Sequence, residues 1–346
     1  MFFCGRRWRI VLFVFVALCH TALSQDKPDP PMNVRLTHGW TNVFAGKPAR
    51  LECQVSSQAV AEATLYWSVS VDRGVIARGS RSFNLVPDRS TDVVIDVEFP
   101  ELRPGLVAPA ALTLQLQAAG RRVDRVVSMH VFSPDIGTNR EQWLKSLEIV
   151  LFDPPKSTQA RMNAARIPFR ISEGPEGLPA SRGLLIHGEG IDPARQIASW
   201  HAAQAAAASG RRVIVLASAG ATLPVESLFA AGADGSNSIT LRRSDVIHIL
   251  DKRLDATQWP APGRLVAASL HWTSKAGRPH VELRNDALGW PWVDIRYANG
   301  GRLIWTGIGL IESWETTPAA RYLFVKMLED LMVEEPVTRG QEHDAP

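Results

Sequence analysis

Apolar and polar side chains alternate with a period of two between residues 33 and 133. In Leu51-Glu52-Cys53-Gln54-Val55, for example, every second residue is apolar. This period places one row of side chains on a buried face and the other in solvent, as in a half-buried strand. About seven such strands in about 100 residues predict an antiparallel β-sandwich. The clearest segments are 51–55, 65–71, 93–99, 112–116 and 127–131.

The pattern changes between residues 141 and 335, where apolar runs of strand length alternate with helical segments. Asp192-Pro193 and Thr317-Pro318 each supply a capping residue followed by proline, which favours a helix start. Alternating strands and helices predict a parallel sheet with helices on both faces. Residues 221–301 interrupt this order as a β-rich insertion. The expected strands are 147–152, 168–171, 183–186, 212–216 and 302–305; the helices are 157–166, 192–210 and 317–331; and the insertion holds a helix at 244–254 and strands at 265–274, 280–284 and 292–297.

The N-terminal segment has the features of a signal peptide. Three arginines within residues 1–24 precede an apolar run from Ile10 to Cys19, and small residues suit cleavage before Gln25. We expect an exported protein, periplasmic or extracellular. An uncleaved N-terminal anchor is the alternative, and it is the only membrane contact expected. A proline-rich linker at 25–32 follows, and the charged tail at 336–346 is expected to be disordered.

Composition narrows the function classes. The 346 residues are 45% hydrophobic and 21% charged, as in globular proteins. The net charge of +3 comes from the three N-terminal arginines, because the 38 basic residues less these three equal the 35 acidic ones. A balanced mature chain disfavours a nucleic-acid partner. Cys53 is the only cysteine after cleavage, so neither a disulfide nor a cysteine metal site is expected, and no cofactor is implied.

The first domain resembles the immunoglobulin fold. Cys53 and Trp67 have a spacing similar to that of the core cysteine and tryptophan of immunoglobulin domains. The second cysteine is missing, and Leu114 or Leu116 stands on the expected partner strand. We therefore expect immunoglobulin-like packing without the disulfide, with Cys53 as a small buried side chain.

The second domain resembles the class I glutamine amidotransferase-like domain, which has a flavodoxin-like fold. Residues 183–190 (GLLIHGEG) are similar to its strand and glycine-rich oxyanion loop, and residues 192–218 to its helix and the strand before the nucleophile elbow. Residues 300–331 are similar to the C-terminal part of non-catalytic members attached to secreted bacterial glycoside hydrolases and other exported proteins. The resemblance covers roughly residues 141–335 and implies the fold more specifically than an activity.

The departures from this family concern its catalytic residues. Its reaction needs a cysteine thiolate activated by a histidine that a carboxylate orients. Here Ala217, Ser218 and Ala219 occupy the elbow, and the late strand leads into Gly307–Glu312 without a histidine. The resemblance therefore implies a scaffold that has lost its catalytic triad.

Other side chains could carry chemistry at the strand ends. Ser218 with His187 as base is one alternative, although the sequence around Ser218 is not Gly-x-Ser-x-Gly. His187 and Glu189 could contact a metal or a sugar hydroxyl, but two ligands are too few for a metal site. Glycoside hydrolysis would require two carboxylates at a defined distance, for which Glu189, Glu312 and Asp153 are the candidates.

Tryptophans gather late in the chain. Trp290 and Trp292 flank Pro291 in a predicted loop, where indole faces could stack on the C–H faces of sugars. The alternative, which we favour, is hairpin core and interdomain packing.

The sequence thus predicts a multidomain chain: a β-sandwich at 33–133, then a degenerate amidotransferase-like α/β domain at 141–335. The favoured function is non-catalytic binding or assembly in the cell envelope, with a protein or carbohydrate partner. The alternative is a glycoside hydrolase, or another hydrolase, that uses carboxylates at the strand ends.

Overall fold

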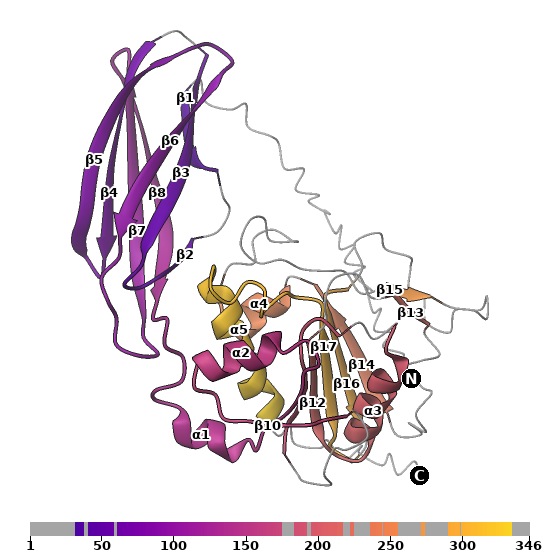
Figure 1. Ribbon diagram of the computed structural model, residues 1–346. Coiled ribbons are helices and arrows are strands. Elements are labelled where there is room, and N and C mark those ends of the chain that lie inside the picture. Colours follow the sequence, from indigo (N-terminus) through magenta and orange to yellow (C-terminus); the bar gives the residue numbers. More distant parts are fainter. Residues whose placement is uncertain are drawn as a thin grey trace, which may run out of the picture.

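The chain forms three larger sheets, a two-stranded ribbon and five helices in the part that the computed structural model describes (Figure 1). It is a β-rich protein with several sheets, the largest of which mixes parallel and antiparallel strands. The described residues are 32–37, 41–58, 61–174, 183–191, 195–216, 222–224, 236–243, 245–254, 271–273, 290–297 and 299–333.

Two sheets build the N-terminal region. The smaller has the order β1-β3-β6 and the larger the order β2-β8-β7-β4-β5; β2 pairs with β8 in parallel, and all other pairs are antiparallel. The strands are β1 (Met32–Leu36), β2 (Asn42–Phe44), β3 (Pro48–Ser57), β4 (Ala61–Val71), β5 (Gly74–Leu85), β6 (Ser90–Glu98), β7 (Val107–Ala118) and β8 (Arg121–Phe132). Each predicted segment of period two corresponds to one of them, although the segment 93–99 extends one residue beyond β6. Strand β5 was not predicted from the sequence. It lies at the edge of its sheet and is largely exposed, so its apolar residues do not alternate regularly with polar ones.

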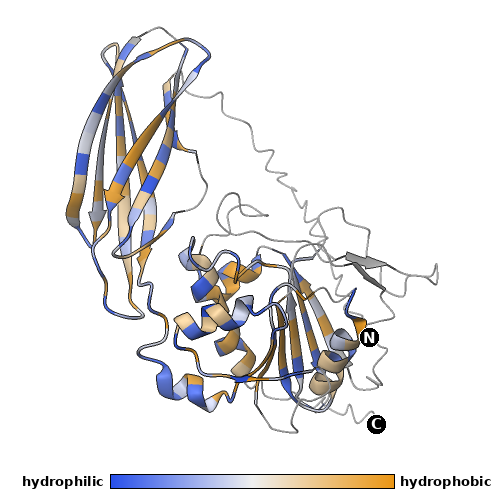
Figure 2. Cartoon of the chain, viewed as in Figure 1, coloured by the Kyte–Doolittle hydropathy of each residue, from blue (hydrophilic) through white to orange (hydrophobic). Residues whose placement is uncertain are grey.

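The inward rows of both sheets form one common core. Cys53 on β3 and Leu114 on β7 are both fully buried in it. Figure 2 shows the alternation as bands of both colours along these strands. Burial raises the pKa of the Cys53 thiol to about 11, so this side chain is an unreactive packing group, as expected.

The second region is built on a seven-stranded sheet in the order β10-β9-β11-β12-β17-β16-β14. Its first five strands run parallel; β16 pairs antiparallel with β17, and β14 pairs antiparallel with β16. The strands are β9 (Val150–Phe152), β10 (Arg170–Ile171), β11 (Leu185–His187), β12 (Arg212–Leu216), β14 (Ser236–Arg242), β16 (Trp292–Tyr297) and β17 (Arg302–Thr306). The ribbon pairs β13 (Thr222–Pro224) with β15 (His271–Thr273).

Helices cover both faces of this sheet, as Figure 1 shows. Helix α3 (Ile197–Ala208) packs Trp200 against Trp305 of β17. The other face carries α1 (Glu141–Ser146), α2 (Ser157–Ala164), α4 (Asp245–Leu250) and α5 (Pro318–Met332). Helix α5 begins as predicted: Thr317 Oγ1 accepts from the Ala319 N–H, and Pro318 takes the first helical position.

Several predicted element boundaries differ from the structure; the strand predicted at 147–152, for example, begins at Val150. Helix α3 begins at Ile197, since residues 195 and 196 are not helical; the predicted start at Asp192-Pro193 lies outside the described residues. Helix α4 ends at Leu250 instead of residue 254. The Asp251 carboxylate accepts hydrogen bonds from the Arg253 N–H (3.0 Å) and guanidinium, and this local bonding competes with a further helical turn. The predicted hairpin strand at 265–274 is described only as β15, which pairs in parallel with β13. The strand predicted at 280–284 lies outside the described residues.

Helix α5 also contacts the N-terminal region. The Tyr322 hydroxyl donates to the carbonyl of Ser133 (3.2 Å), and its ring meets Phe132 edge-on at 4.7 Å between centroids. The Arg321 guanidinium donates to the Pro134 carbonyl (2.7 Å) and lies 4.8 Å from the Phe44 ring centroid. The two regions therefore share a packed boundary at the segment that the sequence predicts as the domain junction.

Candidate functional site

The parallel strands of the mixed sheet reverse their order between β9 and β11. The chain leaves β9 towards β10 on one side, and then crosses to β11 on the other. Open α/β sheets bind ligands beyond the carboxyl ends of the strands at such a reversal. Here the carboxyl ends carry Asp153 after β9 and His187, Gly188 and Glu189 in and after β11. We call Asp153, His187 and Glu189 the strand-end cluster.

Asp153 holds the start of helix α2. Its side chain is buried, and Oδ2 accepts from the Gln159 N–H at 2.7 Å. The carboxylate thus occupies the helix N-terminus, where such folds place a bound anion. Gly188 permits this arrangement, since a Cβ there would lie 2.2 Å from Asp153 Oδ1. Burial raises the pKa of Asp153, and the backbone N–H groups of α2 oppose this rise.

His187 faces helix α3. Its Nδ1 lies 3.1 Å from the Ser199 hydroxyl, and its ring meets Phe152 edge-on at 5.4 Å. The side chain is 1% exposed, and this burial lowers its pKa to about 4. An effective general base near neutral pH needs a pKa close to the working pH. His187 is therefore a neutral core imidazole whose one polar contact in the described region is Ser199.

Glu189 ties the β11 loop to two other parts of the domain. Its carboxylate oxygens accept the N–H groups of Ile311 (2.8 Å) and Glu312 (2.9 Å). Its own N–H donates to Thr158 Oγ1 at 2.8 Å. Burial raises the pKa of Glu189, while the backbone hydrogen bonds lower it and the neighbouring Glu312 charge raises it further. Both oxygens are thus committed to backbone donors.

The predicted site residues do not converge as one constellation. His187 and Glu189 both stand at the end of β11, but their contacts lead to opposite partners, α3 and residues 311–312. Glu312 is near Glu189 through its backbone N–H, and its side chain is exposed. Ser218 lies outside the described residues, so the serine–histidine pair is not tested.

The two candidate platform tryptophans have different surroundings. Trp292 on β16 is 2% exposed and belongs to the core. Trp290 is half-buried, and its ring lies 4.8 Å from the Arg243 guanidinium. A joint sugar platform is therefore wrong for Trp292, because its indole faces are covered by core side chains. The packing interpretation holds for that residue.

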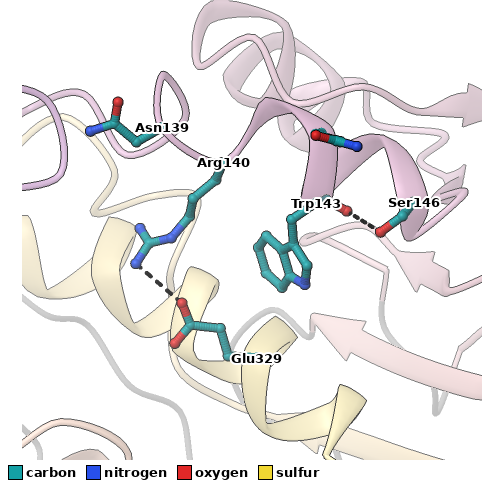
Figure 3. A pocket seen from close by; sticks show the side chains of 6 residues that line it. Asn139, Arg140, Trp143, Ser146 and Glu329 are labelled. Carbon is teal, nitrogen blue, oxygen red and sulfur yellow. Dashed lines mark hydrogen bonds and ion pairs between the residues drawn. The ribbon is translucent and has the colours of Figure 1, made fainter.

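Sequence reasoning missed a groove between α1 and α5 (Figure 3). Its volume is about 620 Å³. No predicted helix covered α1, because six residues are too few to show a helical period. The groove is lined by Asn139, Arg140, Gln142, Trp143, Ser146 and Glu329.

The described residues contain no group of three or more histidine, cysteine or acidic side chains placed to hold a metal ion. Among the same residues, none of the helices combines the length and the apolar character needed to cross a bilayer.

No family model matches this chain, and no curated protein matches it either. Solved structures match only in part. Sporulation control protein Spo0M from Bacillus subtilis is 14% identical over 34% of this chain and 54% of its own, with a TM-score of 0.22. A family 123 glycoside hydrolase from Clostridium perfringens is 9% identical over 38% and 32%, with a TM-score of 0.23.

The alkylpurine DNA glycosylase AlkC from Pseudomonas fluorescens is 12% identical over 29% of this chain and 30% of its own, with a TM-score of 0.23. This chain therefore spans about half or less of each of these three proteins. Similarities of this size carry no argument about activity, and the chain is assigned to no family by them.

Proposed function

We propose that this protein is an exported, non-catalytic binding or assembly protein of the cell envelope. In this proposal an immunoglobulin-like domain precedes a flavodoxin-like domain that has lost the amidotransferase triad. The strand orders support both names. Three strands face five in the first region. In the second region the five parallel strands, numbered along the chain, lie side by side in the order second, first, third, fourth, fifth.

The observation that carries the proposal is the state of the strand-end cluster. In an enzyme of this architecture, polar groups at the strand ends face the substrate. Here the carboxylates of Glu189 and Asp153 bind backbone N–H groups of the same chain, and His187 is buried and neutral. The protein itself fills the positions that a substrate anion would take, which favours a structural role for these residues.

A direct test is turnover by the mature protein from Gln25 onward. Release of ammonia from glutamine and cleavage of a panel of chromogenic glycosides are measured beside the double variant Glu189→Gln/Glu312→Gln. We expect no difference from the variant with any substrate. Turnover that disappears in the double variant would overturn the proposal.

A hydrolase is the second candidate, and one observation favours it. A glycosidase acid needs a carboxyl group with a raised pKa, and burial raises the pKa of Glu189 next to the exposed Glu312. The backbone hydrogen bonds on both Glu189 oxygens argue against it, since a proton donor must present one oxygen to the substrate. The same glycoside panel separates the two functions.

A further inference from the structure

The groove between α1 and α5 is an open surface depression that is lined by five polar or charged side chains and one tryptophan. Its volume of about 620 Å³ falls in the usual range for small-ligand sites. Figure 3 shows Arg140 and Trp143 extending from the start of α1 towards α5, with the Glu329 carboxylate of α5 directed at Arg140. Trp143 is half-buried, Gln142 is exposed, and both line the groove.

Hydrogen bonds and ion pairs hold three polar side chains of the groove in place: Asn139, Arg140 and Glu329. Arg140 Nη2 lies 3.1 Å from Glu329 Oε1, and Lys326 Nζ lies 2.7 Å from Glu329 Oε2. The Asn139 amide N–H donates to the Pro104 carbonyl at 3.0 Å. Side chains that are ordered before binding lose little entropy when a ligand arrives. The groove is therefore preformed.

The ionised side chains of the groove are already paired with one another. The Glu329 carboxylate meets both the Arg140 guanidinium and the Lys326 ammonium, and Arg140 also donates to the Ile136 carbonyl. A charged ligand would have to compete with an existing ion pair. A neutral ligand with many hydroxyl groups can instead add hydrogen bonds to the amides of Asn139 and Gln142 and to the edges of the ion pair.

A pyranose combines the two surfaces that this groove complements. Its C–H face is apolar and fits a flat indole, and its rim of hydroxyls both donates and accepts. We infer that the α1–α5 groove binds a neutral oligosaccharide, with Trp143 as the stacking residue. This inference rests on the proposed binding role and names its ligand class.

The test is a binding titration of the mature protein with three neutral probes: cellotriose, maltotriose and triacetylchitotriose. We expect at least one to bind, with the affinity reduced about tenfold or more by Trp143→Ala and several-fold by Gln142→Ala. The matched controls are Trp290→Ala, another half-buried tryptophan, and Gln117→Ala, an exposed glutamine on β7. Both are expected to bind as the unchanged protein does.

Each other outcome has a defined meaning. Failure of all three probes to bind, or binding that survives both Trp143→Ala and Gln142→Ala, overturns the inference. Loss of binding in Trp290→Ala instead would move the site to that tryptophan and also overturns it. If Trp143→Ala does not fold, Gln142→Ala and Glu329→Gln decide. Cleavage of a bound probe would overturn the non-catalytic function and leave the groove assignment standing.

Discussion

The strand-end cluster and the α1–α5 groove both contain polar side chains. In the cluster these side chains bind backbone groups, and in the groove they bind one another. In the cluster, buried carboxylates satisfy backbone N–H groups that would otherwise be unpaired. In the groove, half-exposed side chains pair with one another and keep donors and acceptors facing solvent. Burial distinguishes these cases, because a buried polar group cannot bond to bulk water and most such groups pair within the protein. In the cluster, Asp153 Oδ1 and His187 Nε2 are buried without a partner.

This comparison separates stability from binding. Changes in the cluster should lower the free energy of unfolding and leave ligand binding in the groove unchanged. Changes in the groove should have the opposite pattern. Substitution of a carboxylate is thus expected to change the free energy of unfolding in the cluster and ligand affinity in the groove.

The largest effect is expected from Glu189→Ala. It removes the acceptor of two N–H groups, of Ile311 and Glu312, and each buried unpaired group costs roughly 1–3 kcal/mol. We expect the free energy of unfolding in a urea titration to fall by about 4 kcal/mol. Glu312→Ala is the matched control, because its side chain is exposed; a change of about 0.5 kcal/mol or less is expected there. Equal losses in both variants would contradict the structural role of Glu189.

The next effect is a pH dependence caused by His187. Burial lowers its pKa to about 4, whereas an unfolded histidine has a pKa of about 6.5. The unfolded chain therefore binds this proton first, so His187 contributes stability above pH ~6.5 that is lost as the pH falls towards 4. The shift corresponds to about 3 kcal/mol. Chemical denaturation at pH 7 and at pH 4 measures the loss.

The His187→Gln variant isolates this contribution from other groups that titrate in the same range. Its loss of stability between pH 7 and pH 4 should be smaller than that of the unchanged protein by about 3 kcal/mol. His201→Gln, on the same helix that His187 faces, is the control and should keep the original loss. An unchanged loss in His187→Gln would show that the buried imidazole does not control the transition.

Local sequence patterns were sufficient where one face of an element is buried. The alternation around Cys53, the apolar run Arg212–Leu216 and the Thr317-Pro318 helix start all correspond to elements of the structure. Strands β5 and β14 were not predicted. Both are edge strands, and β14 has only two alternating apolar residues, Ile239 and Leu241. Pairing between distant segments leaves little trace in a local pattern.

The candidate site shows the same limit. The sequence located His187 and Glu189 at a strand end, because a glycine-rich segment follows an apolar run. It gave no sign that Glu189 binds the backbone of residues 311 and 312, a contact over more than 120 positions. The groove joins Arg140 to Glu329 across a still larger separation. Such contacts depend on topology, which periodicity does not specify.

A smaller effect is expected at Asp153, where charge and hydrogen bonding can be separated. Asp153→Ala removes the acceptor for the Gln159 N–H and should cost about 1–2 kcal/mol, as the loss of a helix cap does. Asp153→Asn keeps an acceptor and removes a buried charge whose pKa burial has raised. We expect Asp153→Asn to change the free energy of unfolding at pH 7 by less than about 1 kcal/mol. Equal losses would indicate that the charge itself holds α2.

The smallest effect is expected from the ion pair in the groove. Arg140 and Glu329 retain 28% and 32% of their side-chain exposure, and ion pairs in contact with water contribute roughly 0.2–1 kcal/mol. A double-mutant cycle with Arg140→Met and Glu329→Gln should give a coupling free energy of about 0.5 kcal/mol that weakens in high salt. A coupling above ~2 kcal/mol would mean that the pair acts as a buried structural contact, like Glu189. The groove would then be part of the core and not a preformed surface for a ligand.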